Sequence, residues 1–414
     1  MGKAIVIGAG IIGLSSAYYL QQSGWEVTVL EKGDLSDSAS YGNAGMIVPS
    51  HFVPLAAPGM LEKGIKWMFD SKSPFYVRPS LNLNLVGWGL KFMKSANKEQ
   101  ADKAAVPLRD ISLLSKDLYA GITAKIGDFG LTNNGILMLY KTDKVGDEEL
   151  HIAEQARSLG LDAPSLTAAD VQKLQPDLKV DVLGGVHYRC DAHLNPNQLL
   201  LLLKEYLQKA GVKIIKNTEV TKIIQDKGQI TKLIAGEKEY TADHYVLAGG
   251  SWSPEIAKRA GFKIPLMPGK GYSFLIDDTK KNMHIAALLC EAKVSVTPMG
   301  NRIRFGGTME IDAINGRINM NRVKGIVESI PRYFPDLQPE VPATKDIWFG
   351  FRPCSPDGLP YLGNSKSLKN LTVATGHGMM GVSLGPGTGK LVSELINGQT
   401  LSMDIKPFSP NRFL

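Results

Sequence analysis

The sequence predicts an α/β protein with two domains. One is built on a parallel sheet and assembled from separate stretches of the chain, and the other is an α+β domain on an antiparallel sheet. Three observations carry this prediction: a strand, glycine turn, helix and strand at the N-terminus; a strand, glycine-rich turn and helix near the C-terminus; and hairpin patterns between them. The chain has 414 residues, which exceeds one ordinary hydrophobic core and fits two domains.

The N-terminal unit carries the clearest motif. Residues 3–7 (Lys-Ala-Ile-Val-Ile) read as a short buried strand, and residues 8–13 (Gly-Ala-Gly-Ile-Ile-Gly) place a G-x-G-x-x-G turn between that strand and a helix. Gly8 permits the tight turn, Gly10 lets the backbone approach a pyrophosphate, and Gly13 lets helix and strand pack closely. The helix N-terminus offers N–H groups to the phosphates. The residues expected to bind a dinucleotide here are Gly8, Gly10, Ile11, Ile12 and Gly13.

A second strand over residues 27–30 ends at Glu31. The carboxylate of Glu31 can accept hydrogen bonds from the hydroxyls of an adenosine ribose, and Lys32, directly after it, is expected to contact the same cofactor. An acid at the end of the second strand completes the context that a dinucleotide site requires. The first domain is therefore predicted to be of the Rossmann type.

The next segments are a loop and an apolar region. Residues 36–50 are rich in small residues and are predicted to form a loop that lies against something flat and polar. The stretch Leu81 to Met93 could be an amphipathic helix, which either packs on the domain core or meets a membrane surface or a redox partner. A helix is expected over 104–126 and a strand over 136–140. The loop residues expected to contact the cofactor are Asn43, Ala44, Gly45 and Met46.

From residue 195 the pattern returns to α/β. It predicts a Leu-rich helix over 197–209, a strand over 212–215, a β-meander over 218–235, a buried strand over 245–248 and a hairpin within 294–305. The strand 371–374 and the helix 387–397 end the chain. These elements predict a Rossmann-type domain made of 1–50, 146–262 and 350–414, and a substrate domain made of 51–145 and 263–349.

Two features favour FAD over NAD as the dinucleotide. The chain has one convincing G-x-G-x-x-G motif and no second one for a nicotinamide. A second glycine-rich strand end and a glycine-rich turn before the last helix offer backbone that can approach a flavin, and the positive end of that helix would stabilise a reduced flavin. The residues predicted to contact FAD in these segments are Val220, Gly249, Gly250, Trp252, Gly376, Gly378, Met379, Met380 and Gly381.

Composition limits the other functions. The formal net charge is +7, but basic residues are scattered among acids, so no nucleic-acid site is expected. No apolar run approaches the roughly 18 residues of a membrane span, and the first strand begins at once without a signal region, so a cytoplasmic location is expected, with peripheral contact to the inner face of a membrane left open. The three cysteines have no metal-type spacing, and no metal site is predicted.

Six motifs occur along the chain in one characteristic order. They are residues 8–13, Ser40–Gly45, Pro268–Ser273, Gly306–Glu310, Gly350–Pro353 with Asp357–Pro360, and Ala374–Gly378. With them the chain resembles FAD-dependent D-amino-acid oxidases and dehydrogenases, and it resembles the bacterial D-amino-acid dehydrogenase branch most. Glycine and sarcosine oxidases share the general plan. The resemblance spans almost the whole chain.

The resemblance implies roles for several side chains. Arg352 matches the arginine that binds the substrate carboxylate, since arginine is permanently charged and bidentate. Tyr272 matches a position that can hydrogen-bond the substrate, although a core tyrosine is an equal alternative. His377 lies in the flavin turn and could touch substrate or flavin, or only satisfy backbone groups. The remaining candidates are Arg304, Glu310 and His51, for which a structural role is the alternative.

The resemblance also implies a reaction. Hydride leaves the α-carbon of a D-amino acid, such as D-proline, hydroxy-D-proline or D-alanine, and the imino acid hydrolyses to a 2-oxo acid and ammonia, while the electrons go to a quinone or another acceptor. Cys354 is not where a flavin thioether is expected, so the FAD is predicted to be non-covalent. The alternatives are a glycine- or sarcosine-type amine oxidase that uses oxygen, and a non-catalytic flavin-binding subunit that relays electrons.

Overall fold

Two sheets organise the protein. The computed structural model describes residues 1–36, 38–57, 59, 72–78, 82–277 and 283–413. The first sheet has the strand order β19-β20-β13-β1-β2-β9 and is parallel except for β19, which pairs antiparallel with β20. Its strands are β1 (Lys3–Ile7), β2 (Glu26–Leu30), β9 (Lys213–Ile215), β13 (His244–Leu247), β19 (Tyr361–Asn364) and β20 (Leu371–Thr375). These are the strands that the Rossmann-type prediction requires.

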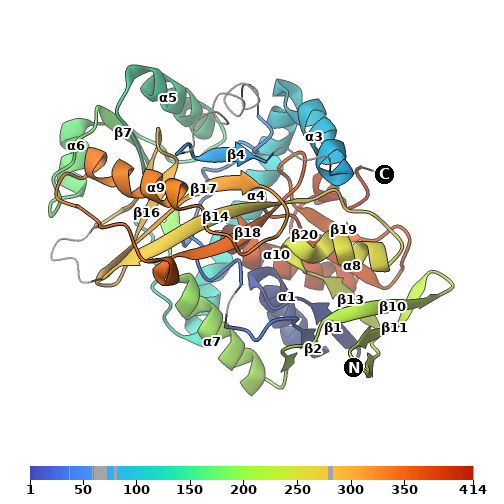
Figure 1. The fold of residues 1–414 in the computed structure, drawn as a ribbon. Helices are drawn as coiled ribbons and strands as arrows, with labels where there is room; N and C mark the ends of the chain where they lie inside the picture. Colours follow the sequence, from blue (N-terminus) through green and yellow to red (C-terminus); the bar gives the residue numbers. More distant parts are fainter. Residues whose placement is uncertain (37, 58, 60–71, 79–81, 278–282, 414) are drawn as a thin grey trace.

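Helices from both ends of the chain cover one face of this sheet. In Figure 1 the blue α1 and the red α10 lie side by side, and α7 and α4 complete the layer. The four helices are α1 (Ile11–Gln22), α4 (Lys98–Ile126), α7 (Pro196–Lys209) and α10 (Gly381–Ile396). Their buried apolar side chains form one core with those of the sheet. The other face is covered by β10 (Val220–Asp226), β11 (Gln229–Ala235), β12 (Lys238–Tyr240) and α8 (Ser253–Arg259).

The second sheet has nine strands among the described residues. Its order is β18-β14-β17-β16-β15-β5-β7-β6, with β4 paired to β17. The strands are β4 (Phe75–Val77), β5 (Ile136–Tyr140), β6 (Ser165–Thr167), β7 (Gly184–Tyr188), β14 (Met267–Ile276), β15 (Ala286–Leu289), β16 (Val294–Met299), β17 (Arg302–Ile311) and β18 (Trp348–Cys354). Most neighbours are antiparallel, as predicted, while β5–β15 and β4–β17 are parallel.

The remaining elements surround this second sheet. Apolar side chains of α9 and α6 share a core with β14 and β17, and α9 lies across these strands in Figure 1. A two-stranded sheet of β3 and β8 joins the loop of residues 38–45 (the flavin loop) to the segment after β7. The elements are α3 (Leu83–Ser95), α5 (Asp143–Ser158), α6 (Ala168–Leu174), α9 (Met320–Tyr333), β3 (Met46–Ile47), β8 (Ala192–His193), and the 3₁₀ turns η1 (Gly250–Trp252), η2 (Thr344–Asp346) and η3 (Lys406–Phe408).

The strand pairing shifts one boundary of the predicted domains. Strands β6 and β7 lie inside the range 146–262 that the sequence predicts for the Rossmann-type domain, yet both hydrogen-bond within the second sheet. Strand β7 pairs with β5, about 45 residues earlier, and β6 pairs with β7, and local patterns do not report such pairings. We therefore propose that the segment up to about residue 190 belongs to the substrate domain.

Glycines let α10 lie close to its neighbours. A Cβ at Gly389 would lie 2.5 Å from the backbone of Ser15 in α1, and one at Gly387 would lie 3.0 Å from the carbonyl of Ile111 in α4. Real Cβ atoms do not approach as closely as 2.5 Å, so Gly389 requires glycine, and at Gly387 a Cβ would be tighter than most real contacts. The run Gly385–Lys390, which superficially resembles a phosphate loop, is thus the interior of a buried helix.

Candidate active site

A cavity of about 1590 Å³ runs from the first sheet to the second. One end is lined by the β1–α1 turn and by the ends of β2 and β13. The other end is lined by the strands β14, β17 and β18, by the N-terminus of α10, and by the segment 51–55. The carboxyl ends of parallel strands are where ligands bind in open α/β sheets.

The β1–α1 turn has no room for side chains at two of its glycines. Gly8 has φ +110°, and a Cβ there would lie 2.5 Å from the carbonyl oxygen of Ala248. A Cβ at Gly13 would lie 1.9 Å from the carbonyl oxygen of Gly8. Gly10, Ile11 and Ile12 line the cavity at the start of α1, where the N–H of Ile11 donates to the hydroxyl of Ser40 at 3.2 Å. This geometry suits a pyrophosphate.

The adenosine end is fixed by charged groups. Glu31 accepts hydrogen bonds from the backbone N–H of Ala9 at 2.7 Å and of Gly33 at 2.8 Å, which holds its carboxylate at the end of β2. Lys32 places its Nζ 3.6 Å from the centre of the Trp252 ring. Burial lowers the pKa of Lys32. A fixed carboxylate at the end of the second strand fits a ribose.

The flavin loop is braced from the second sheet. Arg304 donates to the carbonyl oxygens of Tyr41 at 3.0 Å and Asn43 at 2.8 Å, so this arginine supports the loop. Asn43 in turn donates to the carbonyl of Met379 at 3.3 Å, which joins the loop to the turn before α10. Gly45 has φ +76°, and a Cβ there would lie 2.1 Å from the carbonyl oxygen of Leu194.

The N-terminus of α10 also opens on the cavity. Met380 caps this helix without a side-chain hydrogen bond, and Gly381 lines the cavity. His377 lines it too, but its Nε2 lies 3.0 Å from the hydroxyl of Thr388 inside α10, and burial lowers the pKa of His377 to about 3. One ring nitrogen of His377 is thus engaged inside α10, and contact of this residue with substrate or flavin stays a prediction.

The predicted cofactor residues fall into two groups. Those that line the cavity are Gly8, Gly10, Ile11, Ile12, Glu31, Lys32, Asn43, Ala44, Met46, Val220, Gly249, Gly250, Trp252, Gly378, Met379, Met380 and Gly381. Three others, Gly13, Gly45 and Gly376, are absent from its wall and shape the turns behind it. The N-termini of α1 and α10, the glycine turns and a fixed carboxylate fit an FAD.

Arg352 lies in the wall of the cavity at the second sheet. Gly269 pairs with Arg352 and Gly271 with Gly350 in the β14–β18 ladder, so the guanidinium folds across the backbone of β14. A Cβ at Gly271 would lie 2.0 Å from it. One terminal nitrogen donates to the carbonyl oxygen of Thr308 at 2.6 Å. Within the described part of the chain, no carboxylate pairs with Arg352, and burial lowers its pKa.

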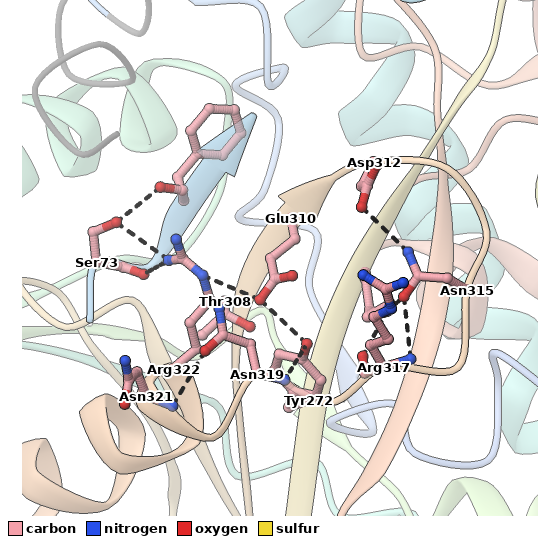
Figure 2. A network of polar contacts seen from close by, with 12 residues as sticks. Ser73, Tyr272, Thr308, Glu310, Asp312, Asn315, Arg317, Asn319, Asn321 and Arg322 are labelled. Atoms are coloured by element: carbon pink, nitrogen blue, oxygen red, sulfur yellow. Dashed lines mark hydrogen bonds and ion pairs between the residues drawn. The ribbon is translucent and has the colours of Figure 1, made fainter. Parts of the chain in front are cut away.

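Tyr272 has its hydroxyl engaged elsewhere, as Figure 2 shows. The hydroxyl donates to Glu310 at 3.2 Å and accepts from the backbone N–H of Asn319 at 3.1 Å. Glu310 also pairs with the buried Arg322 at 3.1 Å. Tyr272 reaches the cavity wall, but its hydroxyl anchors the start of α9. The structure thus favours the core-tyrosine alternative, and it gives Glu310 a structural role.

Some residues of the site were not predicted. Gly271 and Thr308 position Arg352, and both belong to quoted motifs, but their roles depend on strand register. Ser50 and Asp191 form hydrogen bonds behind His51, which lines the cavity as a candidate. A serine before a histidine and a distant aspartate give no local signal in the sequence.

Comparisons with known proteins agree with this geometry. A family model described as FAD dependent oxidoreductase matches residues 3–395. A D-amino acid dehydrogenase of Helicobacter pylori is 30% identical over 394 residues, covering 95% of this chain and 94% of the relative. One of Vibrio atlanticus (strain LGP32) is 30% identical over 420 residues, covering 100% of both. The crystal structure of glycine oxidase from Geobacillus kaustophilus covers 100% of both chains with a TM-score of 0.79 and 24% identity, a likeness of fold. The chain belongs to the FAD-dependent oxidoreductase family, with FAD as its cofactor.

Proposed function

We propose that this protein is a D-amino-acid dehydrogenase. Arg352 carries the proposal: its half-buried guanidinium faces the cofactor cavity, and no acidic side chain of the described residues pairs with it. A partly desolvated cation without a counter-ion is costly, and a substrate carboxylate would compensate it. The relatives named D-amino acid dehydrogenase, at about 30% identity over nearly the whole chain, support the substrate class.

The side chains of the cavity bind and orient the substrate. Arg352 binds the carboxylate through two parallel N–H···O hydrogen bonds. The carbonyl of Thr308 accepts from the guanidinium, and the missing side chain of Gly271 leaves the space that the guanidinium occupies. A fixed carboxylate fixes the α-carbon, and positioning of this kind lowers the barrier substantially. Bound FAD supplies the hydride acceptor. The imino acid product then hydrolyses in water to a 2-oxo acid and ammonia without a protein nucleophile.

We propose that FAD is held without a covalent bond. Cys354 is buried, with its Sγ 4.0 Å from the Sδ of Met309, and it is not among the residues that line the cavity. Burial raises the pKa of the Cys354 thiol to about 12, which keeps it protonated and unreactive. Cys290 does line the cavity, and burial raises the pKa of its thiol as well.

We further propose that the electrons pass to a quinone at the inner face of a membrane. One face of α3 buries Trp88, which donates to the carbonyl of Cys354 at 2.9 Å. The opposite face exposes Leu83, Val86, Leu90 and Met93, which are 84, 49, 58 and 51% exposed. Their spacing of three and four residues places them on one stripe, as in helices that rest on lipid. In the described ranges, no helix is long and apolar enough to cross a membrane.

Steady-state turnover tests this function. The holoprotein is given D- or L-alanine, D- or L-proline, glycine or sarcosine, with either a soluble quinone or oxygen as acceptor. The proposal predicts oxidation of D-isomers, faster with the quinone. Oxidation of glycine or sarcosine alone, with oxygen, would indicate the amine oxidase. Turnover with none of these amines would favour the electron-relay subunit.

A further inference from the structure

A chain of hydrogen bonds leads from the cavity into the core. Ser50 Oγ lies 3.2 Å from Nδ1 of His51 and donates to Oδ2 of Asp191 at 2.6 Å. The backbone N–H of Ser50 donates to Oδ1 of Asp191 at 3.0 Å. His51 lines the same cavity as Arg352, whereas Asp191 is fully buried. The three residues therefore form a path from the substrate site to a buried carboxylate.

The fold brings these residues together from distant segments. Strand β3 pairs with β8, with Met46 opposite His193 and Ile47 opposite Ala192, so Asp191 lies next to the residues that follow β3. The segment is anchored on both sides. Val48 donates its N–H to the hydroxyl of Ser383 at 2.9 Å, and Phe52 is buried in a core cluster. The geometry of the path is thus fixed by packing.

The bonding pattern sets the direction of the path. The Ser50 hydroxyl donates its one proton to Asp191, so it accepts from the Nδ1–H of His51. The other ring nitrogen, Nε2, then carries a lone pair. No described residue makes a hydrogen bond with Nε2, and the ring lines the cavity. A lone pair there can accept a proton from a bound substrate.

The charged and titratable neighbours agree with this arrangement. Burial, together with the positive charge of Lys293, lowers the pKa of His51 to about 4. Burial raises the pKa of Asp191 to about 7, although Ser50, Cys190 and Lys116 act in the opposite direction. Tyr188 also faces Asp191. His51 is therefore neutral at neutral pH, while the carboxylate of Asp191 can take up a proton there.

We propose that His51, Ser50 and Asp191 relay the proton that the substrate ammonium must lose before hydride leaves the α-carbon. The ammonium proton moves to Nε2 of His51, the Nδ1 proton of His51 moves to Ser50, and the Ser50 hydroxyl proton moves to Asp191. His51 and Ser50 end neutral, Asp191 ends protonated, and the substrate ends as the neutral amine. After product release the steps reverse and deliver the proton to water. The inference rests on the proposed amino-acid oxidation.

Ser50 offers a matched pair of variants for the test. Ser50→Ala breaks the path, whereas Ser50→Thr keeps a hydroxyl at the same place. The rate of anaerobic flavin bleaching by a D-amino acid is measured across pH. We expect Ser50→Ala to lower it about 10²-fold near neutral pH. The loss should vanish above the pKa of the substrate amine, where no proton needs to be removed, and Ser50→Thr should follow the wild type.

A second measurement observes the proton without turnover. The analogue 2-aminoisobutyrate has no α-hydrogen and cannot be oxidised. Its binding to the wild-type holoprotein should produce the infrared carbonyl band of a protonated carboxylic acid, and Asp191→Asn should abolish this band. Ser50→Ala should abolish it too, while FAD content stays unchanged in both variants.

Results that contradict the proton relay can be distinguished from results that contradict the proposed amino-acid oxidation. An active wild type whose Ser50→Ala variant is equally fast, or is slowed equally at every pH, would overturn the relay alone. The same holds if the carbonyl band persists in Asp191→Asn. A wild type that oxidises no amino acid would remove the proposed function and the relay with it.

Discussion

The two ends of the cavity differ in the groups that line them. The cofactor end consists mostly of backbone, in the turns after β1 and β13 and at the N-termini of α1 and α10. The substrate end consists of side chains, Arg352 above all, that lie on the face of an antiparallel sheet. Changes at the first end should therefore alter cofactor retention and stability, and changes at the second should alter kinetics while FAD stays bound.

Gly8→Ala should have the largest effect. The new Cβ would combine a φ of +110° with a 2.5 Å approach to the carbonyl of Ala248, a cost of about 4 kcal/mol. We expect a protein that loses FAD and unfolds at lower denaturant concentration. Flavin absorbance after desalting and urea unfolding measure both. Gly121→Ala in α4, where a Cβ meets nothing within 4 Å, is the control.

Arg352→Ala should come next and should separate the two ends. Loss of the bidentate carboxylate contact is expected to cost about 3–4 kcal/mol, which lowers kcat/KM for a D-amino acid roughly 10²- to 10³-fold. FAD content should not change. Turnover equal to that of the wild type would show that the carboxylate binds elsewhere, and loss of FAD would show that the two ends are not independent.

Gly271→Ala tests whether the absence of a side chain at position 271 is needed to position the guanidinium of Arg352. A Cβ 2.0 Å from the guanidinium must displace it, with a cost of about 2 kcal/mol and a fall in kcat/KM of roughly 30-fold. The prediction concerns kinetics with FAD retained. An unaffected kcat/KM would mean that Arg352 can bind substrate from a different rotamer.

Tyr272→Phe should lower stability without affecting chemistry. The change leaves the N–H of Asn319 without its acceptor and removes one donor to Glu310, which should cost about 1.5 kcal/mol in the free energy of unfolding. We expect kcat/KM within about twofold of the wild type. A large kinetic loss with unchanged stability would restore the substrate role that the motif predicts for Tyr272.

Leu90→Glu should have the smallest effect, and only on membrane contact. Leu90 is 58% exposed, so stability should hold, while binding to anionic phospholipid vesicles should weaken about fivefold, or ~1 kcal/mol. Leu201→Glu, at a 46% exposed leucine of α7, is the matched control. Equal binding by all three proteins would remove the proposed contact of α3.

The two ends of the cavity also differ in how far the roles of their residues can be predicted from the sequence. Gly8, Gly10 and Glu31 lie within one short unit, so their roles follow from local spacing. Arg352 was identified through its motif, but the side of the sheet that Tyr272 faces depends on a register shift between Lys270 and Tyr272 opposite β17. A shift of one residue turns a side chain to the other face, and no local pattern records it.

Other features of the site could not be predicted from local sequence patterns, because they depend on pairing between distant segments. Asp191 approaches Ser50 only because β3 pairs with β8, more than 140 residues away. The helix expected from Leu81 to Met93 was confirmed as α3 over Leu83–Ser95, with Leu81 outside the described residues. Trp88 packs on the core, as the first alternative for this helix has it, while contact of the exposed opposite face with a membrane or a redox partner stays a prediction.

The most direct test of the central claim is the visible spectrum of the purified holoprotein, recorded without oxygen before and after addition of D- and L-amino acids. We expect flavin bands that bleach with D-isomers and persist with L-isomers. Bands that bleach only with glycine, sarcosine or L-isomers, or bands that never bleach, would contradict that claim.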